Sequence, residues 1–196
     1  NAVLCLSGGY PEEAPAFAAE RFRALPAGER PPLLPLNAGP DGPRSFFQVW
    51  KVPTVAFKIA HRAYSLRDPG FPALAVLNTI LGGGDSSRLF GRVRDELGLA
   101  YQIDSEAVAW SDAGTLDVVA TSERFEAEAA FGAIAEVLGE VRKGPLEEAE
   151  ILRGKEILLT SMDFMRDNPH DIADWHGRRM LLGDGEAATS LDQEMG

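Results

Sequence analysis

Residues 77–101 decide the fold, and they read LNTILGGGDSSRLFGRVRDELGLAY. The run that leads into them, Phe71–Leu81, is apolar almost all round, which predicts a buried helix. Three glycines at 82–84 end that helix. A second helix is predicted over Ser87–Leu97, because its apolar residues recur every four positions, and Gly98 is its expected C-terminal stop.

Strand and helix patterns surround this stretch. Alternation of apolar and polar residues predicts strands near 47–49 and 55–59, divided at Pro53, and a hairpin follows with a turn at 112–114. The strands of this hairpin are predicted at Tyr101–Trp110 and Thr115–Ala120, and three later helices at about Arg124–Arg142, Leu146–Met165 and His170–Leu182. Because strands and helices do not alternate strictly, the predicted class is α+β: a two-layer sandwich of a mainly antiparallel sheet with helices on one face.

The chain divides into three parts by composition. Residues 26–43 hold six prolines and three glycines, which predicts an extended linker, because proline lacks a donor N–H and fixes φ. Before it, residues 1–25 hold a short strand, Val3–Leu6, and a helix from about Pro11; these cannot bury a core alone and read as the end of a preceding domain. Residues 44–196 form the main domain, in which a capping pattern at Ser190–Gln193 predicts a last helix that is cut off.

Composition excludes several functions. The 196 residues carry a formal net charge of −11, so binding to nucleic acid or to an anionic membrane surface is not expected. No apolar run reaches the length of a membrane span, and we expect no membrane insertion. A single cysteine, Cys5, excludes an internal disulfide framework. The compartment stays open between periplasm and cytoplasm, with the periplasm favoured.

Metal ligands are scarce. The three histidines, His61, His170 and His176, form no His-x-x-Glu-His or His-Glu-x-x-His pattern. His170 and Asp174 stand four residues apart and could meet on one helix face, with Asp171 and His176 nearby, but this is a weak case for a metal site. His170 directly follows Pro169, and we expect it to help start the helix. The sequence therefore predicts no metal site in this chain.

Gly82, Gly83 and Gly84 allow two interpretations. A phosphate loop is excluded, because no Lys-Ser/Thr follows the glycines and Asp85 would face the phosphate. The glycines then form either a tight turn between helices, with a nearby Asp or Ser capping the second helix, or a flexible loop beside a substrate chamber.

Arg94 and Tyr101 are the strongest candidates for catalytic residues in this sequence. Arg94 is expected in the last turn of the second helix and Tyr101 at the start of the next strand, so both side chains emerge at one end of the fold. A guanidinium and a phenol suit the stabilisation of an oxyanion and a peptide carbonyl. The alternative is structural: Arg94 pairs with an acid, and Tyr101 covers the core.

The string Leu77–Phe90, followed by Arg94-x-Glu96-x-Gly98-Leu99-Ala100-Tyr101, strongly resembles the second, zinc-free domain of the pitrilysin/insulinase family of zinc metallopeptidases, which includes the mitochondrial processing peptidases. The resemblance covers essentially the whole chain. It implies one half of a clam-like chamber, facing a zinc domain that carries His-x-x-Glu-His and lies elsewhere in the protein or on a partner subunit.

The resemblance also implies roles for single residues. Tyr101 matches the tyrosine that donates a hydrogen bond to the tetrahedral intermediate, and Arg94 the arginine that binds the substrate carbonyl. Gly82, Gly83 and Gly84 match a glycine-rich segment facing the chamber. The expected function is therefore that of a metalloendopeptidase domain which binds peptide and which is inactive in isolation. The alternative is a non-catalytic partner or scaffold subunit of such an assembly.

Overall fold

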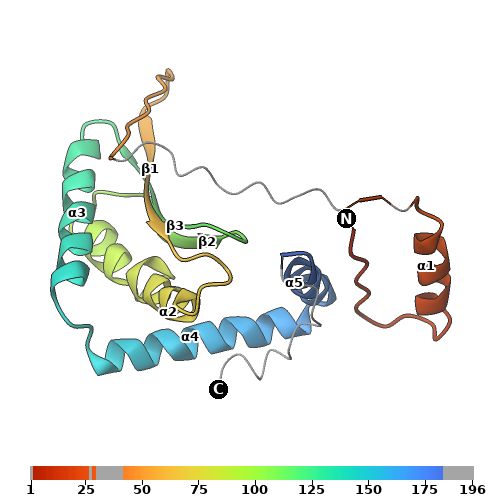
Figure 1. The fold of residues 1–196 in the computed structure, drawn as a ribbon. Coiled ribbons are helices and arrows are strands. Elements are labelled where there is room, and N and C mark those ends of the chain that lie inside the picture. Colours follow the sequence, from red (N-terminus) through yellow and green to blue (C-terminus); the bar gives the residue numbers. More distant parts are fainter. Residues whose placement is uncertain (1, 27, 30–41, 183–196) are drawn as a thin grey trace. The chain divides into compact units, whose positions relative to one another are not determined.

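The computed structural model describes residues 2–26, 28–29 and 42–182. The elements, shown in Figure 1, are α1 (Ala14–Arg23), β1 (Thr54–Ala63), α2 (Phe71–Gly82), η1 (Phe90–Glu96), β2 (Gln102–Ala109), β3 (Gly114–Glu123), α3 (Ala127–Lys143), α4 (Glu148–Asp167) and α5 (Pro169–Leu182). No helix in these ranges is both long and apolar enough to cross a bilayer.

The described residues fall into two compact units. The residues up to 29 group with those from Thr160 to 182, and the residues from 42 to Leu159 form the other unit. The domain limits expected from composition, at 25 and 43, remain a prediction. The second unit contains the sheet and every residue of the predicted site.

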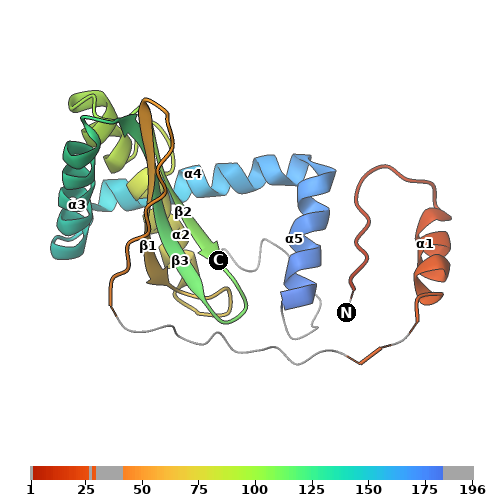
Figure 2. The same cartoon turned by 90° about the horizontal axis from the view of Figure 1, so that it is seen from above.

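An antiparallel sheet of three strands, in the order β1-β3-β2, forms the centre of the second unit (Figure 2). In its register Ala120 of β3 lies between Phe57 of β1 and Ile103 of β2. The predicted hairpin is confirmed: β2 turns into β3, and the Trp110 N–H donates to the Ala113 carbonyl at 2.8 Å. This register sets which side chains meet at the end of β3.

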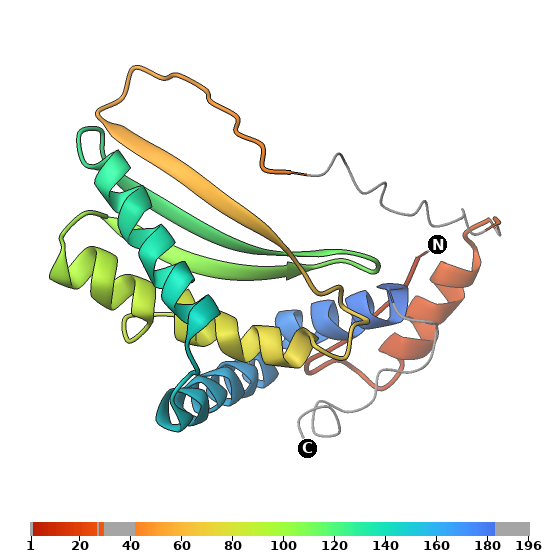
Figure 3. The same cartoon turned by 60° about the vertical axis from the view of Figure 1, so that its left-hand side comes forward.

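Helices cover one face of the sheet, as Figure 3 shows for α2 and α3. Side chains alternate along β3, and Val118 and Ala120 on the covered face are 0% exposed. They pack in one cluster with Leu81 of α2 and Ile134 of α3, which also includes Leu89, Val93, Ala100, Ile103, Ala133 and Val137. The predicted α+β class, with a two-layer arrangement, is confirmed.

Two predicted strands are absent. Residues 3–6 and 47–49 have no strand structure, and the side chains of Phe47 and Val49 are 86% and 92% exposed. Alternation in sequence is a local property, whereas a strand forms only beside another strand that completes its hydrogen bonds. In the part of the chain that is described, neither segment has such a neighbour.

The second predicted helix has an unexpected winding. Its residues Phe90–Glu96 form the π-helix η1. Just after this helix, the Leu99 N–H donates to the Val93 carbonyl at 2.9 Å. Apolar spacing of three and four residues does not distinguish α from π winding, so the sequence predicts only that a helix lies here. The helix predicted to begin at Ser190 lies outside the described residues.

Candidate functional site

Tyr101 lies at the junction between η1 and the sheet. Gly98 has φ +64°, a left-handed conformation that favours glycine and turns the chain out of the helix. Three residues later the Tyr101 N–H donates to the Thr121 carbonyl at 2.8 Å, which joins its backbone to β3 just before β2 begins. The side chain is 56% exposed, so the phenol is accessible.

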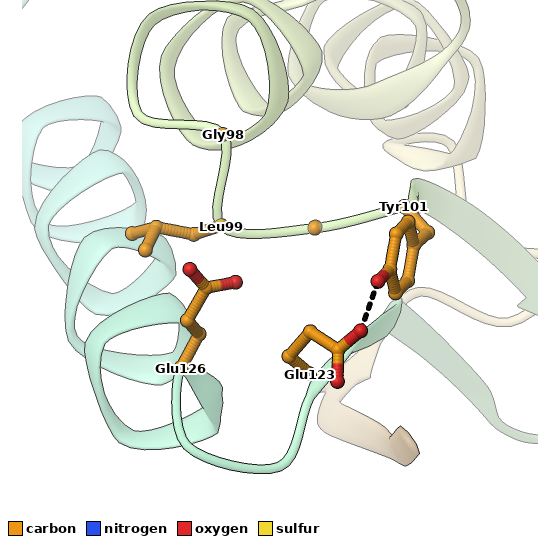
Figure 4. A pocket seen from close by; sticks show the side chains of 6 residues that line it. Gly98, Leu99, Tyr101, Glu123 and Glu126 are labelled. Carbon is orange, nitrogen blue, oxygen red and sulfur yellow. Dashed lines mark hydrogen bonds between the residues drawn. The ribbon is translucent and has the colours of Figure 1, made fainter. Parts of the chain in front are cut away.

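The Tyr101 hydroxyl donates a hydrogen bond to the carboxylate of Glu123, the last residue of β3 (Figure 4). The hydrogen bond to Glu123 is the main cause that raises the pKa of Tyr101 above its ordinary value near 10. Partial burial and the negative charges of Glu123 and Glu126 raise the pKa further. The phenol is therefore held in its protonated form, in which it can donate.

A pocket of about 210 Å³ opens beside this pair. Its lining is made by Gly98, Leu99, Ala100, Tyr101, Glu123 and Glu126. In Figure 4 the Glu126 carboxylate lies near Leu99, on the opposite side of the pocket from Tyr101. Two carboxylates and one phenol thus face the same small space, and no positively charged side chain of the described residues is part of this lining.

Arg94 stands in the last turn of η1, as predicted, and is exposed. Its guanidinium carbon lies 4.6 Å from the centroid of the Phe90 ring, which is cation–π geometry within the same helix. Arg94 does not line the Tyr101 pocket. The structure therefore places Tyr101, Glu123 and Glu126 around one pocket, and Arg94 does not belong to this group.

The three glycines differ in their surroundings. Gly82 is buried, and a Cβ there would stand 2.4 Å from the Ser105 backbone nitrogen, so this position requires glycine for packing against β2. Gly83 and Gly84 are exposed, and Gly84 has φ +132°. The turn continues to Ser87, whose N–H donates to the Gly84 carbonyl at 3.0 Å and whose hydroxyl accepts from the Phe90 N–H at 3.4 Å.

Sequence reasoning did not single out Glu123 and Glu126 for the site. They stand 22 and 25 residues after Tyr101, and a glutamate at a strand end carries no motif. The signal that could have found Glu123 is the hairpin register: Gln102 pairs with Thr121, so the residues flanking this pair lie close together.

The described residues do not fit a catalytic zinc site. Among them, no three or more His, Cys, Asp or Glu side chains are grouped as metal ligands.

Comparison with known proteins finds relatives in sequence and in structure. A family model described as the peptidase M16 inactive domain matches residues 1–158. An uncharacterized zinc protease of Mycobacterium tuberculosis is 41% identical over 97 residues, which cover 46% of this chain and 22% of that protein. A probable inactive metalloprotease of Bacillus subtilis is 33% identical over 91 residues, or 46% of this chain and 21% of that protein. The chain thus spans about a fifth of the length of these two relatives.

A solved structure, the peptidase M16 inactive domain from Pseudomonas fluorescens, superposes with a TM-score of 0.66 at 22% identity. The match covers 74% of this chain and 34% of that one. At this level of identity the likeness establishes the fold.

Proposed function

The chain belongs to the peptidase M16 inactive-domain family, which confirms the resemblance carried by residues 77–101, and from this premise we propose that it binds peptide substrate and stabilises the tetrahedral intermediate of a zinc metalloendopeptidase. In this proposal zinc is bound by another domain of the same polypeptide or by a partner subunit. The chain has no His-x-x-Glu-His motif, so its own part is to bind and orient the peptide.

The Tyr101 phenol is the observation that carries this proposal. It is exposed at the mouth of a pocket, its backbone is fixed by the Thr121 carbonyl, and its hydroxyl, like that of any tyrosine, is protonated at neutral pH and can donate a hydrogen bond. A pre-organised donor of this kind can stabilise the negative charge that develops on the substrate oxygen. We assign that role to Tyr101.

Arg94 and the glycines complete the proposed substrate contacts. Arg94 is exposed and carries a guanidinium, which suits binding to a carbonyl of the substrate backbone. Gly83 and Gly84 are exposed and carry no side chains, so an extended peptide can approach the backbone closely at this turn, whereas Gly82 is buried.

Replacement of Tyr101 by Phe in the complete, zinc-containing protein tests the proposal. Loss of one oxyanion donor typically lowers kcat by about 10²–10³-fold. We expect kcat for a peptide substrate to fall by that order while KM changes little, because the interaction is made in the transition state. Tyr64→Phe, at another exposed tyrosine, is the matched control. If Tyr101→Phe kept normal turnover, the assignment would be wrong.

A scaffold role is the second candidate. It is favoured by the match to a probable inactive metalloprotease and by the position of Arg94, whose guanidinium rests on Phe90 outside the Tyr101 pocket. The two functions are separated by one observation: whether His-x-x-Glu-His occurs in the rest of the parent protein or in a subunit that purifies with it. Its absence from both would favour the scaffold.

A further inference from the structure

We propose that Glu123 is the positioning residue for Tyr101: it holds the phenol in one orientation at the pocket mouth and thereby sets the efficiency of the oxyanion donor. This inference rests on the proposed function of Tyr101. It concerns a residue outside the motif 77–101, and it follows from the hairpin register and from the hydrogen bond that this register creates.

Both partners have backbones that the sheet fixes. Tyr101 is fixed by its N–H, which donates to the Thr121 carbonyl at 2.8 Å. Glu123 is opposite Thr54 in the register between β1 and β3, and its carbonyl accepts from the Ser122 hydroxyl at 3.2 Å and from the Glu126 N–H at 3.1 Å. The two side chains therefore start from fixed points, and the hydrogen bond between them fixes the remaining rotation of the ring.

The exposure of Tyr101 makes this restraint important. A phenol that is 56% exposed has few packing contacts to select one rotamer, so its direction depends on the partner of its hydroxyl. A carboxylate is a strong acceptor, and a phenol bound to it stays protonated. Rotation about the Cζ–Oη bond then turns the Tyr101 O–H from the Glu123 carboxylate toward a substrate oxyanion, with the ring in place.

Glu126 adds charge but no hydrogen bond to the phenol. It lines the same pocket from the far side, and its negative charge also disfavours ionisation of Tyr101. We therefore expect Glu123 to control both the orientation and the ionisation of the phenol, and Glu126 to influence only the ionisation, more weakly.

The first experiment uses the 196-residue chain labelled with ¹³C at the tyrosine Cζ, with Tyr101 assigned from Tyr101→Phe. Glu123→Ala should shift the Tyr101 resonance at pH 7, and both Glu123→Ala and Glu123→Gln should lower the pH at which the phenol ionises. Glu126→Gln should lower it less. Glu128→Gln, an exposed glutamate of α3, is the control and should change nothing. Circular dichroism of each variant establishes that it is folded, and an unchanged Tyr101 resonance and titration in folded Glu123→Gln would overturn the inference.

The second experiment is a double-mutant cycle in the complete, zinc-containing protein. Glu123→Ala should lower kcat by about three- to thirtyfold with KM nearly unchanged, which lies within the roughly two- to 160-fold effects that coupled contacting residues give. Glu123→Gln, which keeps an acceptor, should lose less. Neither change should matter once Tyr101 is Phe. An equal loss in the Tyr101→Phe background would show that Glu123 acts independently of Tyr101. An increase in kcat would show that Glu123 withholds the proton. Either result overturns the inference.

These experiments keep the two proposals apart. If Tyr101→Phe leaves turnover intact, or if the complete protein hydrolyses no peptide, the proposed function fails, and the tyrosine spectra still decide whether Glu123 orients the phenol. If Tyr101→Phe is inactive while Glu123→Ala is fully active, the function stands and the positioning role of Glu123 fails.

Discussion

At the scale of single residues, Lys58 of β1 and Asp117 of β3 form an ion pair on the face of the sheet opposite Val118. The Lys58 ammonium and the Asp117 carboxylate are 2.8 Å apart, the Asp117 side chain is only 7% exposed, and its Oδ1 has no hydrogen-bond partner among the described residues. The hydrogen bond to Asp117 is the main cause that raises the pKa of Lys58. We expect Lys58→Met to lower the midpoint of urea denaturation, because it leaves a buried carboxylate without its cation.

The paired replacement provides the control for that prediction. A chain with both Lys58→Met and Asp117→Val removes the buried charge together with its partner and suits a strand, so it should regain much of the lost stability. If the double variant were as unstable as Lys58→Met alone, Asp117 would not be the reason for the loss.

Gly82 gives a second test at the scale of one residue. A methyl group there would stand 2.4 Å from the Ser105 backbone nitrogen and 2.5 Å from its hydroxyl, and that hydroxyl already donates to the Asn78 side chain at 2.8 Å. We expect Gly82→Ala to lower the free energy of unfolding by about 1–3 kcal/mol, as overpacking does.

Gly132, in the middle of α3, is the matched control for Gly82. Within the described ranges, a methyl group at Gly132 would meet no atom within 4 Å beyond its chain neighbours and its own helix backbone. Gly132→Ala should therefore leave the chain as stable or stabilise it by about 0.5–1 kcal/mol through helix propensity. Chemical denaturation of both variants checks the pair. Equal stability of the two would show that the α2–β2 contact tolerates a side chain.

At the scale of elements, Arg88, in the helical turn just before η1, connects that helix to the start of α4 through an ion pair with Glu150. Its guanidinium donates to both carboxylate oxygens of Glu150, at 2.8 and 2.6 Å, and the same carboxylate accepts from the Glu147 N–H at 3.2 Å. The side chains are 28% and 15% exposed, which makes this pair stronger than a surface ion pair. We expect Arg88→Met to cost about 1–3 kcal/mol of unfolding free energy.

The pH dependence of that loss follows from Glu150. The hydrogen bond from Arg88 is the main cause that lowers its pKa below the ordinary value of 4.5. A carboxylate with a lowered folded-state pKa stabilises fully above the unfolded value, and the stabilisation disappears as the pH falls through the lowered value. The difference between wild type and Arg88→Met should therefore be constant near pH 7 and shrink below pH 4.5. Arg92→Met, at the exposed Arg92–Glu96 pair, should show a clearly smaller loss.

The elements that could be predicted from sequence are those with local causes. Helix α2 follows from the apolar run Phe71–Leu81, α3, α4 and α5 lie close to the predicted ranges, and the β2–β3 hairpin follows from the turn residues Asp112-Ala113-Gly114. The strand expected at 47–49 fails because pairing depends on a second segment, and the π winding of η1 has no counterpart in apolar spacing.

In the site, too, the features with local causes could be predicted, and those that depend on a second segment could not. The position of Tyr101 at the end of η1 could be predicted because Gly98 and the strand pattern are close to it in the sequence. Its partner Glu123 comes from the next strand, and only the antiparallel register brings the two together. Arg94 was expected beside Tyr101 on chain direction alone, which does not specify that its guanidinium lies over the Phe90 ring.

At the scale of the whole molecule, the proposal that another domain or subunit binds the zinc predicts how this chain responds to zinc. The described residues contain no cluster of three or more His, Cys, Asp or Glu side chains that could hold a metal. Zinc near equimolar concentration should therefore leave the melting temperature of the 196-residue chain unchanged, and the chain alone should hydrolyse no peptide. A specific site at 100 times its Kd would add about 2.7 kcal/mol, which for a chain of this size is a rise of roughly 5–10 °C. Thermal unfolding with zinc and with a chelator measures this directly. A saturable rise at one equivalent of zinc, or zinc-dependent hydrolysis by the chain alone, would contradict the assignment of the metal to another domain or subunit.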